Sequence, residues 1–453
     1  FDDFYEDLPA FKEVDLGERE ELLLKKLQLC CFLFPFHDET HFMIDRIQEV
    51  KELKRLILLE LVDLISTTKT WFSLDVLKAI IKMVSTNLFR TLPRSPLPDF
   101  DPEEDEPTLD PCWPHIQIVY EFLLRCVVST DTEMALMRQH VTQDFVRRLL
   151  DLFDSEDPRE RDYLKTIVHR IYGKFMGLRP FIRKSITNLF YEFIYESNRH
   201  NGAGELLEIL GSIINGFALP VKPEHKWFLR NVLIPLHKVD ALSMFHQQLT
   251  YCVTQFVEKD PTLSAVIIGG LLTFWPVTKS AKEVLFLSEV EEILEMTQVD
   301  EFELIMDPLF RRLAACISST HFQVAERSLF LFNNDYITGL SIDFREKVLP
   351  VLLPSLRRNE SHWNEIVRGL TANIVGLFEE TDRDFLLECQ EVLNVQLRAE
   401  SETRIQQLKN WEYLQRLADI NDVKKPIMID VETKYDGSDI SSETNEDLRF
   451  QLS

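Results

Sequence analysis

Apolar side chains recur every three or four positions along most of this 453-residue chain, the spacing that gathers them on one face of an α-helix. After residue 280, for example, Val284, Leu287, Val290 and Leu294 follow this spacing. Strict alternation of apolar and polar residues, which is typical of a half-buried strand, is not convincing in any segment. The pattern therefore predicts an all-α protein. We expect helices at residues 18–35, 46–66, 73–91, 114–128, 142–153, 158–176, 179–196, 203–218, 223–235, 240–257, 261–274, 281–297, 301–316, 320–333, 343–356, 360–379 and 382–415.

Several of these helices begin with sequences that can satisfy the free backbone N–H groups of a first turn. In Asp157-Pro-Arg-Glu160 the aspartate is placed to cap the helix, proline fits the first helical position, and the glutamate can reach back in a capping box. Asp260-Pro261 repeats the cap and the proline, and Ser280-Ala-Lys-Glu283 has the spacing of a second capping box. These signals indicate helix starts independently of the apolar pattern.

Amphipathic helices in such a long series must bury their apolar faces against neighbouring helices. A helix-pair period near 40–47 residues is the range of HEAT and armadillo repeats. We therefore expect a curved α-solenoid of about eight HEAT-like helix pairs, with a compact protein of several helical bundles as the alternative. The expected organisation is an N-terminal extension at 1–17, the solenoid at 18–400, a C-terminal continuation of the last helix at 401–419, and a disordered acidic tail at 420–453.

Composition narrows the range of partners. Fifty basic against 75 acidic residues give a net charge of −25, which argues against nucleic acid or an anionic membrane as the main partner. The 18 residues from Pro261 to Thr278 lack a charge but contain two prolines and two glycines, so we expect a buried helix there and no membrane insertion. Seven cysteines without a C-x-x-C pair indicate free thiols in a reducing compartment, that is, cytoplasm or nucleus.

Two sequences that resemble metal sites fail on inspection, and no cofactor is expected. His37-Asp-Glu-Thr-His41 has aspartate where the zinc protease pattern H-E-x-x-H requires glutamate. The acidic run at 99–110 has Glu104 where a calcium-binding EF-hand loop requires glycine. Phosphate-binding loops and the G-x-S-x-G nucleophile motif are also missing, so nothing in the sequence favours an enzyme.

One stretch differs electrostatically from the rest of the chain. No aspartate or glutamate occurs from Tyr163 through Tyr191, although the same stretch holds six lysines and arginines, which include Arg179 and Arg183 one turn apart. Helical spacing places Lys165, His169, Tyr172 and Met176 along one face of their helix, and Leu206, Ile209 and Ile213 on one face of the helix at 203–218. Packed together, these helices would form a groove with an apolar floor and a cationic wall that suits a short acidic peptide. The alternative is that the apolar residues are ordinary core and the cations a solvated ridge.

Long strings of this sequence resemble a known family. The strings are Asn87-Leu-Phe-Arg-Thr-Leu-Pro93, Phe100-Asp-Pro-Glu-Glu-Asp-Glu-Pro-Thr-Leu109, Leu152-Phe-Asp-Ser-Glu-Asp-Pro-Arg-Glu-Arg-Asp162, His169-Arg-Ile-Tyr-Gly-Lys-Phe175, Glu205-Leu-Leu-Glu-Ile-Leu-Gly-Ser-Ile-Ile-Asn-Gly-Phe-Ala-Leu-Pro220, His321-Phe-Gln-Val-Ala-Glu-Arg327 and His362-Trp-Asn364. They are similar to the B-prime regulatory subunits of protein phosphatase 2A. The resemblance implies a HEAT-like solenoid that is not itself an enzyme, joins a scaffold–catalytic dimer, and recruits substrates that carry L-x-x-I-x-E motifs.

The resemblance also implies roles for individual residues. Tyr172, Ile209 and Ile213 would form the pocket for the motif's isoleucine, while Leu207, Thr166 and the stem of Arg170 would flank its leucine. His169 and Arg170 would receive the glutamate, and Arg179, Lys222 and His225 would meet acidic or phosphorylated positions nearby; Arg183 joins this set because of its charge and spacing. The acidic loop Glu103, Glu104, Asp105 and Glu106, with Trp113, would lie near the partner phosphatase. A HEAT-type adaptor without a phosphatase is the alternative function.

Overall fold

The computed structural model describes residues 8–15, 17–34, 44–67, 73–92, 106–129 and 134–420. Within these ranges the regular structure is entirely helical, which confirms the predicted all-α solenoid class. Contacts divide the chain into two units, residues Phe1–Arg383 and Asp384–Ser453. The stack of helices that positions the candidate site lies in the first unit.

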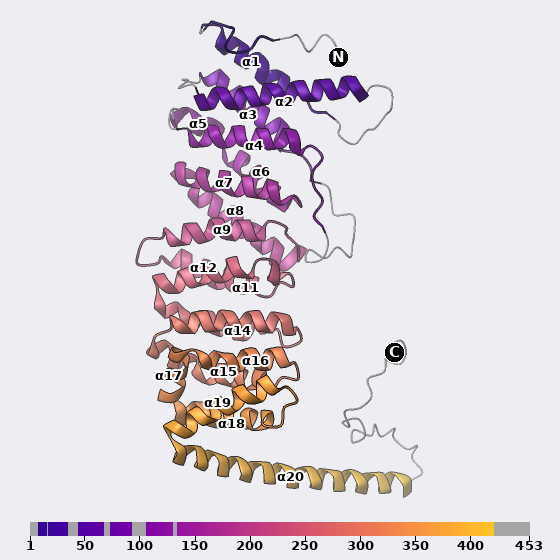
Figure 1. Ribbon diagram of the computed structural model, residues 1–453, viewed down its shortest axis with the longest axis vertical. Helices are drawn as coiled ribbons and strands as arrows, with labels where there is room; N and C mark the ends of the chain where they lie inside the picture. Colours follow the sequence, from indigo (N-terminus) through magenta and orange to yellow (C-terminus); the bar gives the residue numbers. More distant parts are fainter. Residues whose placement is uncertain are drawn as a thin grey trace. The chain divides into compact units, whose positions relative to one another are not determined.

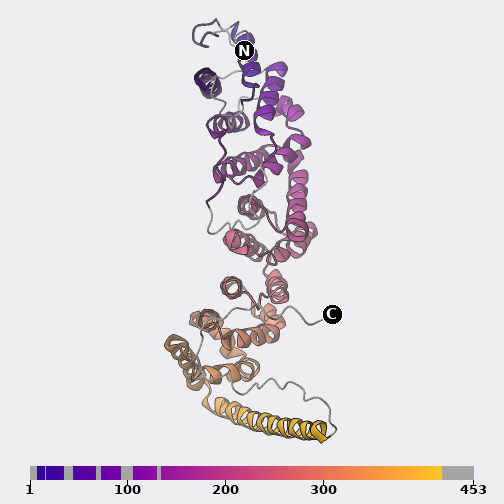
Figure 2. The same ribbon diagram turned by 90° about the vertical axis from the view of Figure 1, so that its right-hand side faces the viewer.

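Helices of the first unit form two layers, and each layer follows the order of the sequence (Figure 1; Figure 2). In one layer each helix contacts the next in a continuous series. This first layer consists of α2 (Ile44–Thr67), α4 (Trp113–Val128), α7 (Pro158–Lys174), α9 (Ala203–Asn215), α12 (His246–Lys259), α14 (Ser280–Glu295), α16 (Phe322–Phe330) and α19 (Glu365–Thr381). Stacking of neighbours in sequence order is the arrangement of a repeat protein.

The second layer supplies the partner helix of each pair. It consists of α1 (Arg19–Cys30), α3 (Leu74–Leu88), α5 (Met134–His140), α6 (Gln143–Asp151), α8 (Arg179–Glu192), α10 (Pro223–Phe228), α11 (Ile234–Leu236), α13 (Ser264–Thr273), α15 (Val299–Ile317) and α18 (Arg345–Asn359). A short helix, α17 (Asp335–Asp343), contacts α14 and α18. Two short helices, α5 with seven residues and α17 with nine, were not predicted from the sequence.

Apolar stripes that the sequence predicts are buried between the layers. On α12, for example, Leu249, Val253 and Phe256 are fully buried, and α12 packs against α9. Close packing also explains one glycine. A Cβ atom at Gly270 on α13 would lie 2.4 Å from Cγ2 of Ile234 on α11, so α13 can approach α11 only where a side chain is lacking.

The predicted helix starts are right in position and partly wrong in mechanism. The Asp157 side chain accepts a hydrogen bond from the Arg159 backbone N–H, so it caps α7 as expected. Neither predicted capping box forms, because the glutamates bind elsewhere. Glu160 is fully buried and accepts hydrogen bonds from Arg90, Tyr120 and Ser155. Glu283 accepts one from the indole N–H of Trp275, at 2.9 Å.

The second unit begins in the long helix α20 (Arg383–Ile420), which covers the predicted last helix and the predicted continuation at 401–419. Residues from 421 onward, and therefore almost all of the predicted acidic tail, lie outside the described residues. The described part of the predicted N-terminal extension contains no helix. Among the described helices, none has the length and apolar character needed to cross a membrane.

Free cysteines are a further feature of the described chain. All seven are unpaired, and five of them are buried. Burial raises the pKa of the Cys126 and Cys252 thiols to about 12, so these residues behave as small apolar side chains. Their role is in packing.

A buried charge cluster joins α12 and α14. His237 is fully buried, and its Nδ1 lies 2.9 Å from the Ile234 carbonyl oxygen while its Nε2 lies 3.0 Å from Glu289 Oε1. Both ring nitrogens face acceptors, so both carry hydrogen and the ring is an imidazolium. His246 Nε2 lies 3.0 Å from the other oxygen of the same carboxylate. The buried Glu289 is thus compensated by two histidines.

The pKa values of this pair define a pH window for stability. Burial lowers the pKa of His237, but the charge of Glu289 and the hydrogen bond to it outweigh that cost, so the pKa is raised. Burial raises the pKa of Glu289, but the two histidines lower it to about 2. The pair therefore stabilises the fold fully between about pH 4.5 and 6.5. Its contribution is lost as the pH rises through the raised pKa of His237, and also in strong acid. Lys282 nearby, whose pKa burial lowers to about 8, adds its own titration above that window.

We predict that Glu289→Gln lowers the free energy of unfolding by about 3–5 kcal/mol at pH 6, because it leaves a buried charge uncompensated. The difference from the wild type should narrow as the pH is raised from 6 to 9. Thermal denaturation followed by circular dichroism measures both effects. Glu412→Gln, on an exposed position of α20, is the control and should change stability by less than about 0.5 kcal/mol. A pH-independent loss in Glu289→Gln would contradict the charged state of His237.

Candidate functional site

The residues predicted to bind an acidic peptide come together on four successive helices. Helices α7 and α9 contact each other in the first layer, and α8 and α10 belong to the second layer. Thr166, His169, Arg170 and Tyr172 lie on α7; Arg179 and Arg183 on α8; Leu207, Ile209 and Ile213 on α9; Lys222 immediately before α10 and His225 within it. We define the cationic site as the charged, histidine and tyrosine members of this set, with the neighbouring Lys184 of α8 added: His169, Arg170, Tyr172, Arg179, Arg183, Lys184, Lys222 and His225.

Exposed cations form the outer part of the cationic site. Arg170 and Lys222 are exposed and form no ion pair with any described residue. His169 is also exposed, and its Nε2 lies 2.9 Å from Ser212 Oγ on α9, so it spans the two neighbouring helices. An anion placed here would find positive charge that the protein itself does not neutralise.

Two arginines hold the ring of Tyr172. Arg179 donates from Nε to the Tyr172 carbonyl at 2.9 Å and from Nη2 to the Gly173 carbonyl at 3.2 Å. These are the free carbonyls at the C-terminal end of α7, where positive charge is favourable. The Arg179 guanidinium also lies 5.2 Å from the centroid of the Tyr172 ring. Arg183 donates to the Tyr172 hydroxyl at 3.2 Å from the next turn of α8.

His225 is a half-buried histidine whose pKa lies below its usual range. Burial lowers its pKa, although Glu224 opposes this effect. Its ring stacks on Phe217 with centroids 3.7 Å apart and planes 9° apart. Glu224 also lies 3.5 Å from Arg183, so its carboxylate is shared between the two positive or titratable groups. His225 therefore meets a ligand as a hydrogen-bonding group rather than as a fixed charge.

Most of the apolar residues predicted for the groove floor are core residues. Leu206 is fully buried, Ile209 is 1% exposed, and Ile213 is 6% exposed. Leu207, which was expected to flank the motif leucine, is also fully buried. Thr166 donates its hydroxyl to the Asp162 carbonyl at 3.1 Å within α7. Tyr172 and Thr166 are half-buried, and Met176 at the end of the same predicted face is exposed. The predicted floor thus lies largely beneath the surface.

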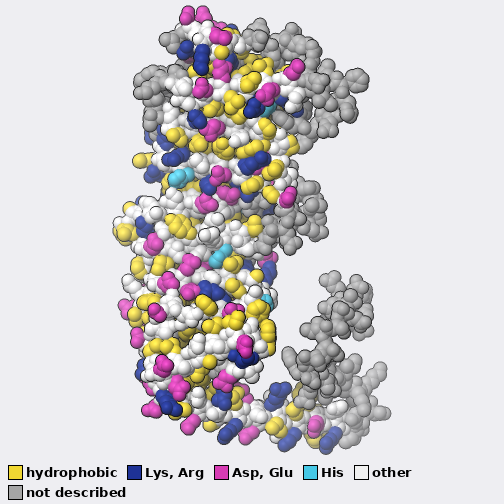
Figure 3. Space-filling view, viewed as in Figure 1, with side chains coloured by type: hydrophobic (Ala, Val, Ile, Leu, Met, Phe, Trp, Pro, Cys, Tyr) yellow, Lys and Arg dark blue, Asp and Glu magenta, His cyan; other side chains and the backbone are white. Residues whose placement is uncertain are grey.

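Two cations of the acid-free stretch are compensated by groups that lie outside it. Lys165 pairs with Asp162 at 2.9 Å and with Glu208 on α9 at 2.8 Å. Lys174 donates to the Val127 and Ser129 carbonyls at the end of α4. Partners come from outside the stretch, so an inspection of the stretch alone could not find them. Figure 3 shows the wider result: basic side chains are interspersed with acidic ones over the face viewed.

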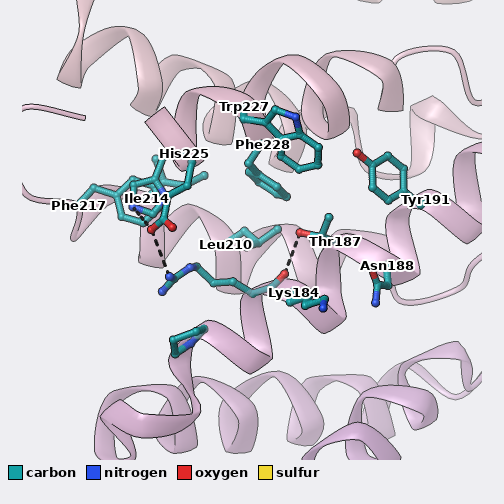
Figure 4. A pocket seen from close by; sticks show the side chains of 13 residues that line it. Lys184, Thr187, Asn188, Tyr191, Leu210, Ile214, Phe217, His225, Trp227 and Phe228 are labelled. Carbon is teal, nitrogen blue, oxygen red and sulfur yellow. Dashed lines mark hydrogen bonds and ion pairs between the residues drawn. The ribbon is translucent and has the colours of Figure 1, made fainter. Parts of the chain in front are cut away.

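A pocket between α8 and α10 was not predicted from the sequence (Figure 4). Its volume is about 370 Å³, and its lining is mostly aromatic and aliphatic. The lining residues are Pro180, Arg183, Lys184, Thr187, Asn188, Tyr191, Leu210, Ile214, Phe217, Glu224, His225, Trp227 and Phe228. The only sequence signal is a cluster of aromatic residues, which is equally typical of core. Arg183, Lys184 and His225 belong to both the pocket and the cationic site.

The acidic loop lies only partly in the described structure. Glu103, Glu104 and Asp105 are outside the described residues, and Glu106 is exposed. The chain that follows is tied to the body by Arg90, which donates to Asp110 Oδ2 at 2.5 Å and to both oxygens of Glu160 at 2.8 and 2.9 Å. Burial lowers the pKa of Arg90, but Glu160 and Asp110 outweigh this effect and raise it, so Arg90 stays charged.

Trp113 is a packed residue rather than a free surface group. It is 8% exposed, its ring centroid lies 6.1 Å from that of Tyr163, and the Arg159 guanidinium lies 4.7 Å from its ring. Its edge lines a shallow pocket with Leu59 and Tyr163. Any contact with a partner would use this edge.

Metal binding is not indicated in the part of the chain that the structure describes. No group of three or more histidine, cysteine or acidic side chains there could hold an ion. The histidines of His37-Asp-Glu-Thr-His41 lie outside the described residues. Helix pairs stacked in sequence order define the structural class of this protein, a helical-repeat solenoid.

Comparison with known proteins identifies the family. The model of the protein phosphatase 2A regulatory B subunit (B56 family) matches residues 8–418. The chain is 53% identical over 419 residues to the B' beta isoform of the 57 kDa regulatory subunit of this phosphatase from Arabidopsis thaliana, covering 91% of the chain and 83% of that protein. It is 50% identical over 422 residues to the delta isoform of the 56 kDa regulatory subunit from Oryctolagus cuniculus, covering 91% of the chain and 71% of that protein. The chain therefore belongs to the B56 family of protein phosphatase 2A regulatory subunits, and it is a regulatory, non-catalytic protein.

We predict that Arg90→Met lowers the free energy of unfolding by about 3–5 kcal/mol, because the buried Glu160 carboxylate loses its positive partner. Adding Glu160→Gln should recover part of this loss, since the double variant no longer buries a charge. Urea denaturation of Arg90→Met, Glu160→Gln, the double variant and the wild type measures the coupling. Arg147→Met removes an exposed arginine of α6 and should leave the denaturation midpoint unchanged. A double variant that is less stable by the sum of the single effects would contradict the coupling.

Proposed function

We propose that this chain recruits substrates to protein phosphatase 2A by binding an acidic L-x-x-I-x-E motif at the cationic site. The observation that carries the proposal is the exposed, unpaired Arg170 and Lys222 beside a tyrosine ring held by two arginines. Family membership supports the same assignment. The motif glutamate meets His169 and Arg170, and its isoleucine packs on Tyr172 and the accessible edge of Ile213.

Buried residues take a supporting part in this proposal. Leu207 and Ile209 lie beneath the surface and hold α9 in place against α12 and α7, so they shape the site without large contacts to the peptide. Thr166 and the stem of Arg170 flank the motif leucine. Arg179, Arg183, Lys222 and His225 face acidic or phosphorylated positions next to the motif. Phosphorylation there adds charge toward the cations and tightens binding.

The expected affinity is moderate. A hydrogen bond to a charged group contributes about 1.5–3 kcal/mol. A buried aliphatic anchor contributes a similar amount, about 1.5–3 kcal/mol. After the cost of ordering a disordered peptide, a dissociation constant on the order of micromolar follows. Such an affinity suits a substrate that must be released.

The same proposal places the chain in a complex with the scaffold and catalytic subunits of the phosphatase. The acidic segment Glu103–Glu106 and the edge of Trp113 would lie near the catalytic subunit and regulate access to it. Support comes from the exposure of Glu106 and from Arg90, which ties Asp110, four residues after the segment, to Glu160 of α7. Free cysteines throughout the described chain fit action in the cytoplasm or nucleus.

We predict that Arg170→Glu abolishes binding of an L-x-x-I-x-E peptide without unfolding the chain, because it places a carboxylate opposite the motif glutamate. Fluorescence anisotropy with a labelled peptide measures the affinity, and circular dichroism verifies the fold. Arg311→Glu reverses an exposed charge on α15, far from the cationic site, and should change the affinity less than twofold. Retained affinity in Arg170→Glu would overturn the assignment of the site.

We also predict that the chain elutes from a size-exclusion column as a 1:1:1 complex with a purified scaffold–catalytic dimer. Arg170→Glu should enter this complex normally, since the cationic site serves substrates and not assembly. Separate peaks from a well-folded chain would instead indicate a HEAT-type adaptor with another effector.

A further inference from the structure

We propose that the pocket between α8 and α10 is a second subsite, which takes a bulky apolar side chain from the flank of the acidic peptide bound at the cationic site. This inference rests on the proposed function. It adds a specificity determinant outside the motif: of two peptides with the same motif, the one with a phenylalanine or leucine in the correct flanking position binds more tightly.

The shape and lining of the pocket suit an aromatic or branched aliphatic side chain. Its volume is about 370 Å³, and a dry cavity of about 150 Å³ already accommodates benzene. Leu210 and Ile214 of α9 form the floor, and Tyr191 and Trp227 form walls from α8 and α10. Figure 4 shows Tyr191 at one end of the pocket, Phe217 and His225 at the other, and Leu210 between them.

Trp227 is the exposed apolar group that such a ligand would cover. It is 51% exposed, and its ring centroid lies 6.4 Å from that of Tyr191 at an interplanar angle of 72°. A half-exposed tryptophan beside an open apolar pocket is a typical anchor point at protein interfaces. Burying this surface favours occupation by an apolar side chain.

The pocket is continuous with the cationic site through shared residues. Arg183 lines the pocket and also donates to the Tyr172 hydroxyl at 3.2 Å. His225 lines the pocket from α10 and stacks on Phe217. A peptide bound beside Tyr172 therefore reaches the pocket by passing Arg183. No second, separate ligand is needed to explain the pocket.

Charge at the rim indicates the same acidic ligand. Lys184 and Asn188 line the pocket and are exposed, and their side chains have no hydrogen-bond or ion-pair partner among the described residues. The one lining carboxylate, Glu224, is already shared by Arg183 and His225. Lys184 is thus free to attract an acidic residue next to the apolar anchor. The amide of Asn188 can bond the backbone of the peptide.

Backbone geometry marks the two walls of the pocket. Helix α8 continues into a π-helical segment at Phe193–Ser197, and α10 continues into another at Leu229–Leu233. Wide π turns are less favourable than α turns and occur often at functional sites. The two π-helical segments begin just after the pocket-lining residues Tyr191 and Phe228. Both walls of the pocket therefore end in a π-helical segment.

The test uses the full chain and a set of fluorescein-labelled peptides that share one L-x-x-I-x-E core. A single phenylalanine is moved through six positions on each side of the core, and a peptide with serine at all these positions is the reference. Fluorescence anisotropy gives each dissociation constant. Phenylalanine at one or two adjacent positions should tighten binding about 10-fold or more over the reference, which corresponds to the lower end of what burial of one such ring contributes.

Two variants test whether the tighter binding of the phenylalanine peptide comes from the pocket. Trp227→Ala removes a wall, and Asn188→Trp fills the pocket from an exposed position, so in each variant the best phenylalanine peptide and the reference should bind equally. Trp363→Ala removes another exposed tryptophan, between α18 and α19, and should keep the full gain.

The outcomes separate the subsite from the proposed function. A reference peptide that binds but gains nothing from phenylalanine at any position overturns the subsite alone. A gain that survives both Trp227→Ala and Asn188→Trp also overturns it, because the ring then binds elsewhere. A reference peptide that fails to bind the wild-type chain overturns the proposed function and the subsite together.

Discussion

Burial of apolar stripes between successive helices is the interaction on which the rest of this structure depends. No helix of the stack can bury its own apolar face, so each relies on the neighbours that precede and follow it in the sequence, as α9 does on α7 and α12. The contacts are therefore local along the chain. Charged groups that are buried between the helices have partners of opposite charge nearby, as the Glu289 carboxylate has in His237 and His246.

The candidate site follows from this stacking, because helix ends gather along the edges of such a stack. The C-terminal turn of α7, the start of α8 and the start of α10 bring free carbonyls, arginines and a histidine together. Arg179 shows the dual consequence: the same guanidinium completes the end of α7 and lies against the ring of Tyr172. Arg179 and Arg183 already bond other groups of the protein. The positive charge available to a ligand is therefore concentrated on the unpaired side chains of Arg170, Lys184 and Lys222.

Much of the fold and of the site could be predicted from the sequence, and the failures have a common cause. Helix periods and the caps at Asp157 and Asp260 depend on residues one to four positions apart, and these predictions are confirmed. The roles of Glu160 and Lys165 depend on Arg90 and Glu208, which lie on other parts of the stack. A charge count along the sequence cannot see such partners. The sequence left open whether Leu206 and Ile209 form a groove floor or ordinary core, and the structure shows that both are buried.

The sequence by itself determined the all-α repeat architecture and the family, since apolar period, caps and long family-typical strings are all local properties. Only the tertiary structure decided which cations remain unpaired, that Glu160 and Glu289 are buried in charge clusters, and that a pocket opens between α8 and α10 beside Tyr172. These features depend on side chains that are far apart in the sequence and are brought within a few ångströms by stacking. Distance in space, not spacing along the chain, sets the strength of charge pairing and the shape of a cavity.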